Sequence, residues 1–310
     1  MIIFSDRSPS VSVVMPVYNG DKYLIEAIQS ILNQTFYDFE IIIIDDGSKD
    51  KSRSIVKSII DRRIVFIQNS LNRGNYCCRN YGMQISKGKY ICVMDADDIS
   101  EPERLQKQFQ FMEDNSEIGI CGTFIRNIPS NISPRFITDC EHLKVAFLSN
   151  NFCSHPSLIM RKVYLDKYNL HYNEDYYYSA DFDLCARGFR HFKIENIPEV
   201  LLQYRRHKDQ ISSAKFDEQT KYADDIRINQ LIDVLGFDLE EIPVLLHLNL
   251  MKRLPLNSQD VDAATKWIRR ILEKNNSVAY YKQEILEQFL FSCINYSVNI
   301  AFQNSKGVHR

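Results

Sequence analysis

Short apolar runs alternate with helical segments over residues 12–94, and this alternation constrains the fold more than any other feature. The apolar runs, at 12–17, 39–44, 64–68 and 90–94, are rich in Val and Ile, while the segments between them repeat apolar residues at helical spacing. Strands that alternate with helices of this length form right-handed βαβ units. We therefore predict an α/β fold, Rossmann-like, with a mostly parallel sheet flanked by helices.

The second half of the chain predicts a different organisation. A helix and a strand-like run follow residue 101, then an irregular stretch continues to about residue 212, and from 214 onward the apolar periodicity is helical. We expect a sheet-containing domain over residues 1–212 and an all-helical C-terminal extension over 213–310. Within the extension, the apolar segment 244–256 carries Lys252 and Arg253. Core packing, peripheral contact with a membrane and, for the last helix, homodimer formation all remain open for this extension.

Charge and cysteine content exclude several classes of protein. The 38 Lys and Arg residues against 40 Asp and Glu residues give a net charge of −2, which argues against a nucleic-acid-binding protein. Eight cysteines without a C-x-x-C pair, and a first segment that does not look like a secretion signal, indicate a cytoplasmic protein with unpaired thiols. No segment is apolar enough to predict a membrane span.

Acidic residues follow the predicted strands where a parallel sheet places its ligand crevice. Asp95, Asp97 and Asp98 come directly after the run 90–94. Carboxylates in this spacing suit Mg²⁺ or Mn²⁺, which prefer oxygen donors and are commonly shared with substrate phosphates. The alternative is a solvated loop in which Asp98 caps the next helix.

Two further acidic positions have similar alternatives. Asp46 follows the second strand and can accept hydrogen bonds from a planar base or a ribose, with Tyr18 stacking on the base; helix capping and ordinary packing are the alternatives. Asp181, in the segment SADFDL, can serve as a general base or as a helix cap. Asp183 shares a face with it only on a strand.

A cationic segment, Tyr204-Arg205-Arg206-His207, closes the predicted sheet domain. Cations or a metal compensate the charge of a phosphate leaving group, and His207 is a possible metal ligand. A basic surface cluster is the alternative interpretation.

Several of these motifs occur together in an order that resembles the family-2 inverting glycosyltransferases, which have the nucleotide-sugar-binding GT-A fold. The matching segments are SVVMPVYNG at 12–20, ILNQTFYDFEIIIIDDGSKD at 31–50, NRGNYCCRNYG at 72–82, GKYICVMDADD at 88–98, HPSLIMRK at 155–162, SADFDL at 179–184 and YRRHKDQIS at 204–212. The resemblance covers about Val11 to Ser212 and leaves the helical extension unexplained.

The resemblance implies a role for each matching residue. The residues it implies are Pro16, Tyr18 and Asp46 at the base, Arg79 near the nucleotide, Asp95 at the ribose or metal, Asp97 at the metal, His207 at the metal or diphosphate, Asp181 as the catalytic base, and His155 with Asp98 at the substrate pocket. The implied cofactor is Mn²⁺ or Mg²⁺. The implied donor is a nucleotide sugar, with a UDP-sugar favoured.

The sequence also departs from the family pattern. Ala180 replaces the acidic residue that often precedes the catalytic aspartate, and no Q-x-x-R-W motif is present because the single tryptophan, Trp267, lies in ATKWIRR. The missing motif argues for addition of one sugar rather than processive synthesis.

The expected activity is therefore inverting, metal-dependent transfer of a single sugar to a hydroxyl of a glycan or lipid-linked saccharide, in surface-polysaccharide synthesis such as that of O-antigen or capsule. A metal-dependent phosphohydrolase acting on nucleotides and a catalytically silent nucleotide-binding scaffold are the alternative hypotheses.

Overall fold

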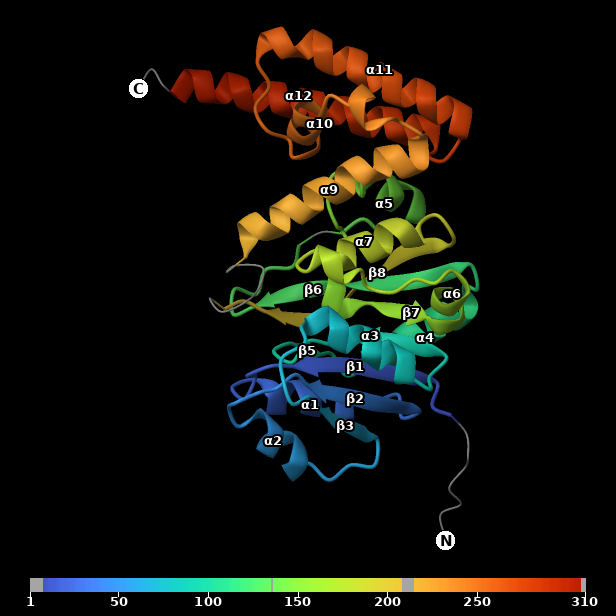
Figure 1. Cartoon of the computed structure of the whole chain (residues 1–310), viewed down its shortest axis with the longest axis vertical. Helices are drawn as coiled ribbons and strands as arrows, with labels where there is room; N and C mark the ends of the chain where they lie inside the picture. Colours follow the sequence, from blue (N-terminus) through green and yellow to red (C-terminus); the bar gives the residue numbers. More distant parts are fainter. Residues whose placement is uncertain (1–7, 135, 208–214, 308–310) are drawn as a thin grey trace. The chain divides into compact units, whose positions relative to one another are not determined.

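The computed structural model describes residues 8–134, 136–207 and 215–307, and its chain divides into two compact units (Figure 1). The sheet unit comprises Met1–Thr138 and Cys153–Lys215, and the helical unit comprises Asp139–Phe152 and Phe216–Arg310. The boundary expected at 212/213 lies outside the described residues. Residues 139–152, which the sequence analysis assigned to the first domain, group with the helical unit because Val145 and Leu148 belong to its core.

The sheet unit is built on one eight-stranded sheet, which confirms the predicted α/β class (Figure 1). Its order is β3-β2-β1-β4-β7-β6-β8-β5. β1 to β4 are mutually parallel, β7 runs antiparallel to β4 and β6, β8 is parallel to β6, and β5 is antiparallel to β8. The strands are β1 (Val11–Val17), β2 (Phe39–Asp45), β3 (Ile64–Gln68), β4 (Tyr90–Val93), β5 (Ile99–Ser100), β6 (Ile118–Ile128), β7 (Ile159–Arg161) and β8 (Lys193–Arg205).

Helices cover both faces of this sheet, which explains why β2 is apolar at almost every position. On one face, α1 packs its buried residues Leu24, Ile28 and Ile31 in the same core as Val13 and Ile41. On the other face, Cys78 of α3 packs with Ile42 and Ile44. The helices of this unit are α1 (Leu24–Leu32), α2 (Ser52–Ser58), α3 (Asn75–Ile85), α4 (Arg104–Asp114), α6 (Lys162–Lys167) and α7 (Ala180–Gly188).

The register of the first strands brings their carboxyl ends to one edge of the sheet. Val17 at the end of β1 pairs with Asp45 at the end of β2, and Val14 pairs with Val93 at the end of β4. The N–H of Asp46 donates to the carbonyl of Val17 over 2.7 Å. The loops that carry the predicted site residues therefore start from neighbouring positions.

The helical unit has its own apolar core. It contains α5 (Cys140–Ala146), α9 (Phe216–Leu235), α10 (Val244–Met251), α11 (Val261–Val278) and α12 (Gln283–Gly307). Trp267 is buried in this core and its indole N–H donates to Nδ1 of His247 over 3.2 Å. In the apolar segment singled out from the sequence, Leu250 and Met251 pack in the core while Leu245 is exposed.

Among the described residues, no helix is both long and apolar enough to cross a bilayer. The eight cysteines, all of which lie within the described ranges, form no disulfide, as the absence of paired cysteine motifs predicts.

Candidate active site

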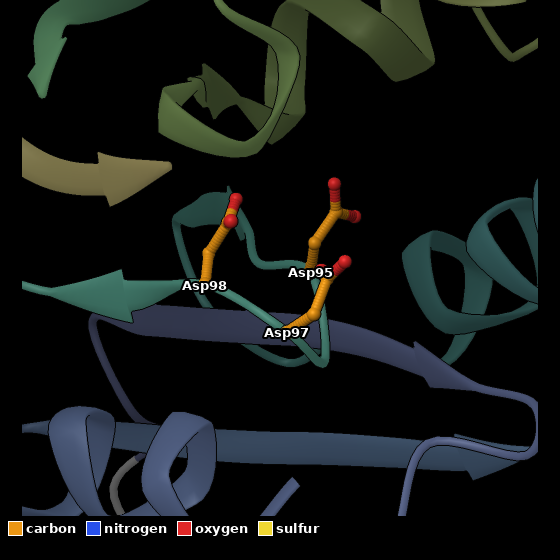
Figure 2. Close-up of side chains that lie close together, drawn as sticks. All are labelled: Asp95, Asp97 and Asp98. Atoms are coloured by element: carbon orange, nitrogen blue, oxygen red, sulfur yellow. The ribbon is translucent and has the colours of Figure 1, made fainter. Parts of the chain in front are cut away.

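Three carboxylates gather in the loop that joins β4 to β5 (Figure 2). One ligand oxygen of each of Asp95, Asp97 and Asp98 lies within 4.8 Å of the others. We call these residues the acidic triad. The loop begins where β4 leaves the sheet, so a buried parallel strand fixes the position of all three side chains.

The acidic triad has the donor chemistry of a site for a hard divalent cation. Asp98 accepts the backbone N–H of Arg205 on Oδ1 at 2.8 Å, while its Oδ2 is buried with no hydrogen-bond partner among the described residues. Burial, then the negative charges of Asp95 and Asp97, raises the pKa of Asp98 well above its usual range. Three oxygen donors with an unsatisfied buried acceptor fit Mg²⁺ or Mn²⁺. The capping alternative for Asp98 is wrong, since the start of α4 carries no side-chain cap.

His207 joins the acidic triad from the segment that follows β8. Its Nε2 lies 2.8 Å from Oδ2 of Asp97, and its ring lies 5.4 Å from that of Tyr23. The neighbouring Arg205 donates from Nε to the carbonyl of Asp97 over 2.7 Å. Residues 97 and 207, far apart in the sequence, therefore meet at one side of the site. The motif residues 208–212 lie outside the described part of the chain.

Arg79 supplies a buried cation beside the acidic triad. It lies on α3, its side chain is only 2% exposed, and its guanidinium pairs with the carboxylate of Asp95. The Nε and Nη1 atoms of Arg79 are buried without a hydrogen-bond partner in the described ranges. Such unsatisfied donors suit the oxygens of a diphosphate.

The predicted base-binding residues lie at the ends of β1 and β2. Tyr18 is half exposed directly after β1, and Pro16 belongs to that strand. Asp46 is buried and accepts hydrogen bonds from Asn69 Nδ2 and from the backbone N–H groups of Arg73 and Gly74. Burial raises the pKa of Asp46, but these hydrogen bonds outweigh it and leave the pKa below 3.8. Asp46 thus also anchors the loop that leads into α3, a role that sequence reasoning missed.

Asp181 lies in the first turn of α7 and contacts α3. Its Oδ1 accepts a hydrogen bond from the hydroxyl of Tyr76 at 3.1 Å. Asp183 is instead paired with Arg187 at 2.6 Å, one turn along the same helix. Because the segment is helical, the two aspartates diverge, and only Asp181 takes part in this contact with α3.

His155 lies close to Tyr76 and Tyr172. It begins the 3₁₀ helix His155–Ser157, and its Nε2 lies 2.9 Å from the hydroxyl of Tyr172. Burial and the nearby charge of Arg79 lower the pKa of His155 well below its usual value, so the imidazole is neutral. Tyr76 lies in the matching segment 72–82, but neither Tyr76 nor Tyr172 was given a role from the sequence, because that role depends on which segments the fold brings together.

The strand order and the acidic triad after β4 are those of a GT-A-like fold. The chain belongs to glycosyl transferase family 2, whose family model matches residues 12–168, and it is a glycosyltransferase. The resemblance stated from the sequence is therefore confirmed.

Relatives and solved structures agree with this assignment. An uncharacterized glycosyltransferase of Methanocaldococcus jannaschii is 39% identical over 207 residues, covering 64% of this chain and 71% of the relative. One from Haemophilus influenzae is 32% identical over 255 residues, covering 76% and 79%. Among solved structures, S. aureus TarS 1–349 in complex with UDP-GlcNAc has a TM-score of 0.63 at 15% identity, covering 96% of this chain and 92% of that chain.

A second solved structure has the same fold. A mannosyltransferase from Pyrobaculum calidifontis, in complex with GDP-Man and Mn²⁺, has a TM-score of 0.60 at 13% identity, covering 94% of this chain and 88% of that chain. At these identities the two solved structures support the fold assignment alone.

Proposed function

We propose that this glycosyltransferase moves one sugar from a nucleotide sugar to an acceptor hydroxyl with inversion at the anomeric carbon. The observation that carries the proposal is that α3 contacts both Asp181 and the acidic triad: the hydroxyl of Tyr76 donates to Asp181, and Arg79, three residues further along α3, pairs with Asp95. The pKa of Asp95 is raised by burial and further by the charges of Asp97 and Asp181, against the opposing charge of Arg79. This arrangement supports a cation-binding end and a general base in one site.

The donor end of the site is formed by the acidic triad, His207 and Arg79. Asp97, with Asp95, Asp98 and His207 beside it, would hold Mn²⁺ or Mg²⁺, and that cation would compensate the charge of the diphosphate. The unsatisfied N–H donors of Arg79 would complement the same charge. Tyr18, Pro16 and Asp46 would surround the base of the nucleotide.

The acceptor end of the site is centred on Asp181. Its carboxylate takes the proton of the acceptor hydroxyl as the hydroxyl oxygen attacks the anomeric carbon. The new C–O bond forms on the face opposite the diphosphate while the bond to the diphosphate breaks, so the configuration inverts. Asp98 and His155 are the proposed substrate-pocket residues next to this centre.

The family and its structural neighbours support a nucleotide-sugar donor. TarS has been solved with UDP and with UDP-GlcNAc, and the mannosyltransferase with GDP-Man and Mn²⁺. We favour a UDP-sugar donor and a glycan or lipid-linked saccharide acceptor, used in synthesis of a surface polysaccharide.

The test is a panel of nucleotide sugars scored for release of the nucleoside diphosphate, with and without saccharide acceptors, in Mn²⁺, Mg²⁺ or chelator. Transfer predicts release that depends on acceptor and cation. Inorganic phosphate released without acceptor would support a phosphohydrolase, and nucleotide binding without any turnover would support a scaffold.

A matched pair of variants tests the proposed base. Asp181→Asn should lower turnover by about three orders of magnitude or more and leave nucleotide affinity unchanged. Asp183→Asn, two residues further along α7 and paired with Arg187, is the control and should keep turnover near that of the wild type. Near-normal turnover of Asp181→Asn would remove Asp181 from this role.

A further inference from the structure

We propose that Tyr76 is a positioning residue that holds the carboxylate of Asp181 in the orientation needed for attack by the acceptor hydroxyl. The inference rests on the proposed role of Asp181 as general base. It assigns to Tyr76, which lies in the matching segment 72–82 but received no role from the sequence, a function in the reaction rather than in packing alone.

The contact itself is a long-range hydrogen bond between two helix starts. Tyr76 lies in the first turn of α3 and its hydroxyl is 3.1 Å from Oδ1 of Asp181, in the first turn of α7. Burial, followed by the negative charge of Asp181, raises the pKa of Tyr76 well above 10. The phenol therefore keeps its proton, and since an ionised carboxylate only accepts, the direction of the hydrogen bond is fixed.

The ring of Tyr76 is itself held by neighbouring side chains. It packs against the ring of Tyr172, with centroids 5.1 Å apart. Asn80, one turn further along α3, holds the backbone of Tyr172 from both sides: its Oδ1 accepts the N–H and its Nδ2 donates to the carbonyl, each over 2.9 Å. Tyr172 in turn contacts Nε2 of His155 through its hydroxyl. Tyr76, which donates the hydrogen bond to Asp181, is thus fixed by a network of described residues, and such fixing is what preorganisation of a catalytic group requires.

Other ionisable groups among the described residues also act on Asp181. Asp95, from the loop after β4, repels the charge of Asp181. Tyr172 and Cys185, from the segment before α7 and from α7 itself, are buried in their neutral forms, with pKa values raised by burial and, for Cys185, first by a hydrogen bond with Cys153. Tyr76 donates directly to the carboxylate of Asp181 and therefore favours its ionised form.

The test compares three tyrosine-to-phenylalanine variants by the pH dependence of kcat/KM with the best donor and acceptor. Tyr76→Phe keeps the ring and deletes the hydroxyl. We expect the acidic limb of the kcat/KM profile to move up by roughly one pH unit, because the carboxylate of Asp181 loses a hydrogen-bond donor. We also expect kcat to fall about tenfold at neutral pH, because the carboxylate loses its fixed orientation. Affinity for the nucleoside diphosphate, measured by calorimetry, should stay unchanged.

Two controls separate this role from packing. Tyr81→Phe changes an exposed tyrosine on the same helix and should leave the profile unchanged. Tyr172→Phe breaks the contact with His155 but keeps the Tyr76–Asp181 hydrogen bond, and should leave the acidic limb in place. Unfolding temperatures of all three variants show whether any loss of kcat comes from the fold.

Tyr76→Phe and Asp181→Asn together separate the role of Tyr76 from that of Asp181. A wild-type pH profile and kcat in Tyr76→Phe, together with an inactive Asp181→Asn, would overturn the role of Tyr76 and leave the role of Asp181 intact. An active Asp181→Asn would overturn both. A limb shift in Tyr76→Phe that is absent from Tyr81→Phe and Tyr172→Phe supports the inference.

Discussion

Arg79 pairs with Asp95 through one guanidinium nitrogen, while its other two nitrogens are buried without a hydrogen-bond partner among the described residues. A buried donor left unsatisfied costs free energy comparable to a lost hydrogen bond. The carboxylate neutralises the buried cation. In the proposed donor site, a diphosphate that accepted hydrogen bonds from the remaining N–H groups would recover that free energy on binding.

Arg79→Lys should weaken binding of the nucleoside diphosphate about tenfold. Lysine keeps the positive charge opposite Asp95 but loses the planar fork, so it cannot contact the carboxylate and phosphate oxygens together. Calorimetric titration with UDP and GDP measures the effect. Arg62→Lys, an exchange at an exposed arginine, is the control and should bind like the wild type. Equal affinities for the two variants would contradict a role for Arg79 in nucleotide binding.

Asp46→Asn should lower the free energy of unfolding by about 1–3 kcal/mol at pH 7, because three hydrogen bonds to a buried carboxylate are weakened. The pKa of Asp46 lies below its usual 3.8, so the stabilisation is fully present above about pH 5. It is lost as the pH falls through the lowered pKa of the folded state. The difference between wild type and variant should therefore shrink only at acidic pH.

Urea unfolding followed at several pH values between 2 and 8 checks this prediction. Asp114→Asn, at an exposed position at the end of α4, provides the control and should change stability by less than about 0.5 kcal/mol. A difference for Asp46→Asn that stays constant down to pH 2 would show that the carboxylate does not stabilise the fold through its charge.

The first four strands could be predicted because each is a short, mostly apolar run with its own local signal. The run 64–68 coincides with β3, and the runs 12–17 and 39–44 differ from β1 and β2 by one residue. The acidic triad followed from the same reasoning, since three carboxylates directly after a buried strand lie at the sheet edge whatever the rest of the fold does.

The remainder depends on contacts between distant segments, which periodicity does not encode. Tyr76 and Asp181 are separated by 105 positions in the sequence. Nothing in the sequence around either residue indicates that the two are in contact. Residues 139–152 are likewise assigned to a unit by what Val145 and Leu148 pack against. Sequence reasoning predicted the secondary-structure elements and the ends of the strands, but not the side-chain network around Asp181.

Gly82→Ala should lower the free energy of unfolding of the sheet unit by about 1–3 kcal/mol. Helix propensity alone predicts the opposite, a rise in that free energy of up to about 1 kcal/mol. Gly82 lies where α3 crosses β1, and a Cβ there would overlap Cγ1 of Val14 and lie 3.2 Å from Cδ1 of Ile44. Thermal and urea unfolding measure the change. The double variant with Val14→Ala should recover part of the loss, and an absence of coupling between the two sites would contradict the packing explanation.

Asp98→Asn should stabilise the protein in chelator while removing its stabilisation by Mn²⁺. Asparagine keeps Oδ1 as acceptor for the N–H of Arg205, but it deletes a buried carboxylate that faces Asp95 and Asp97. Without a cation, the loss of like-charge repulsion should raise stability by about 1 kcal/mol. With Mn²⁺ at a hundredfold excess over Kd, the wild type should gain about 2.7 kcal/mol, whereas the variant should gain little.

Unfolding temperatures in chelator and in Mn²⁺, each with and without UDP, separate the two effects without relying on turnover. A variant that is less stable than the wild type in chelator and still responds fully to Mn²⁺ would mean that Asp98 supports only the loop before β5. We expect the order of stability to reverse: the variant should be more stable without the cation, and the wild type should be more stable with it. That result would mean that repulsion among the carboxylates of the acidic triad lowers the stability of the free protein and is relieved when the cation binds. Such a site gives up stability of the free protein for affinity toward a cation and its diphosphate.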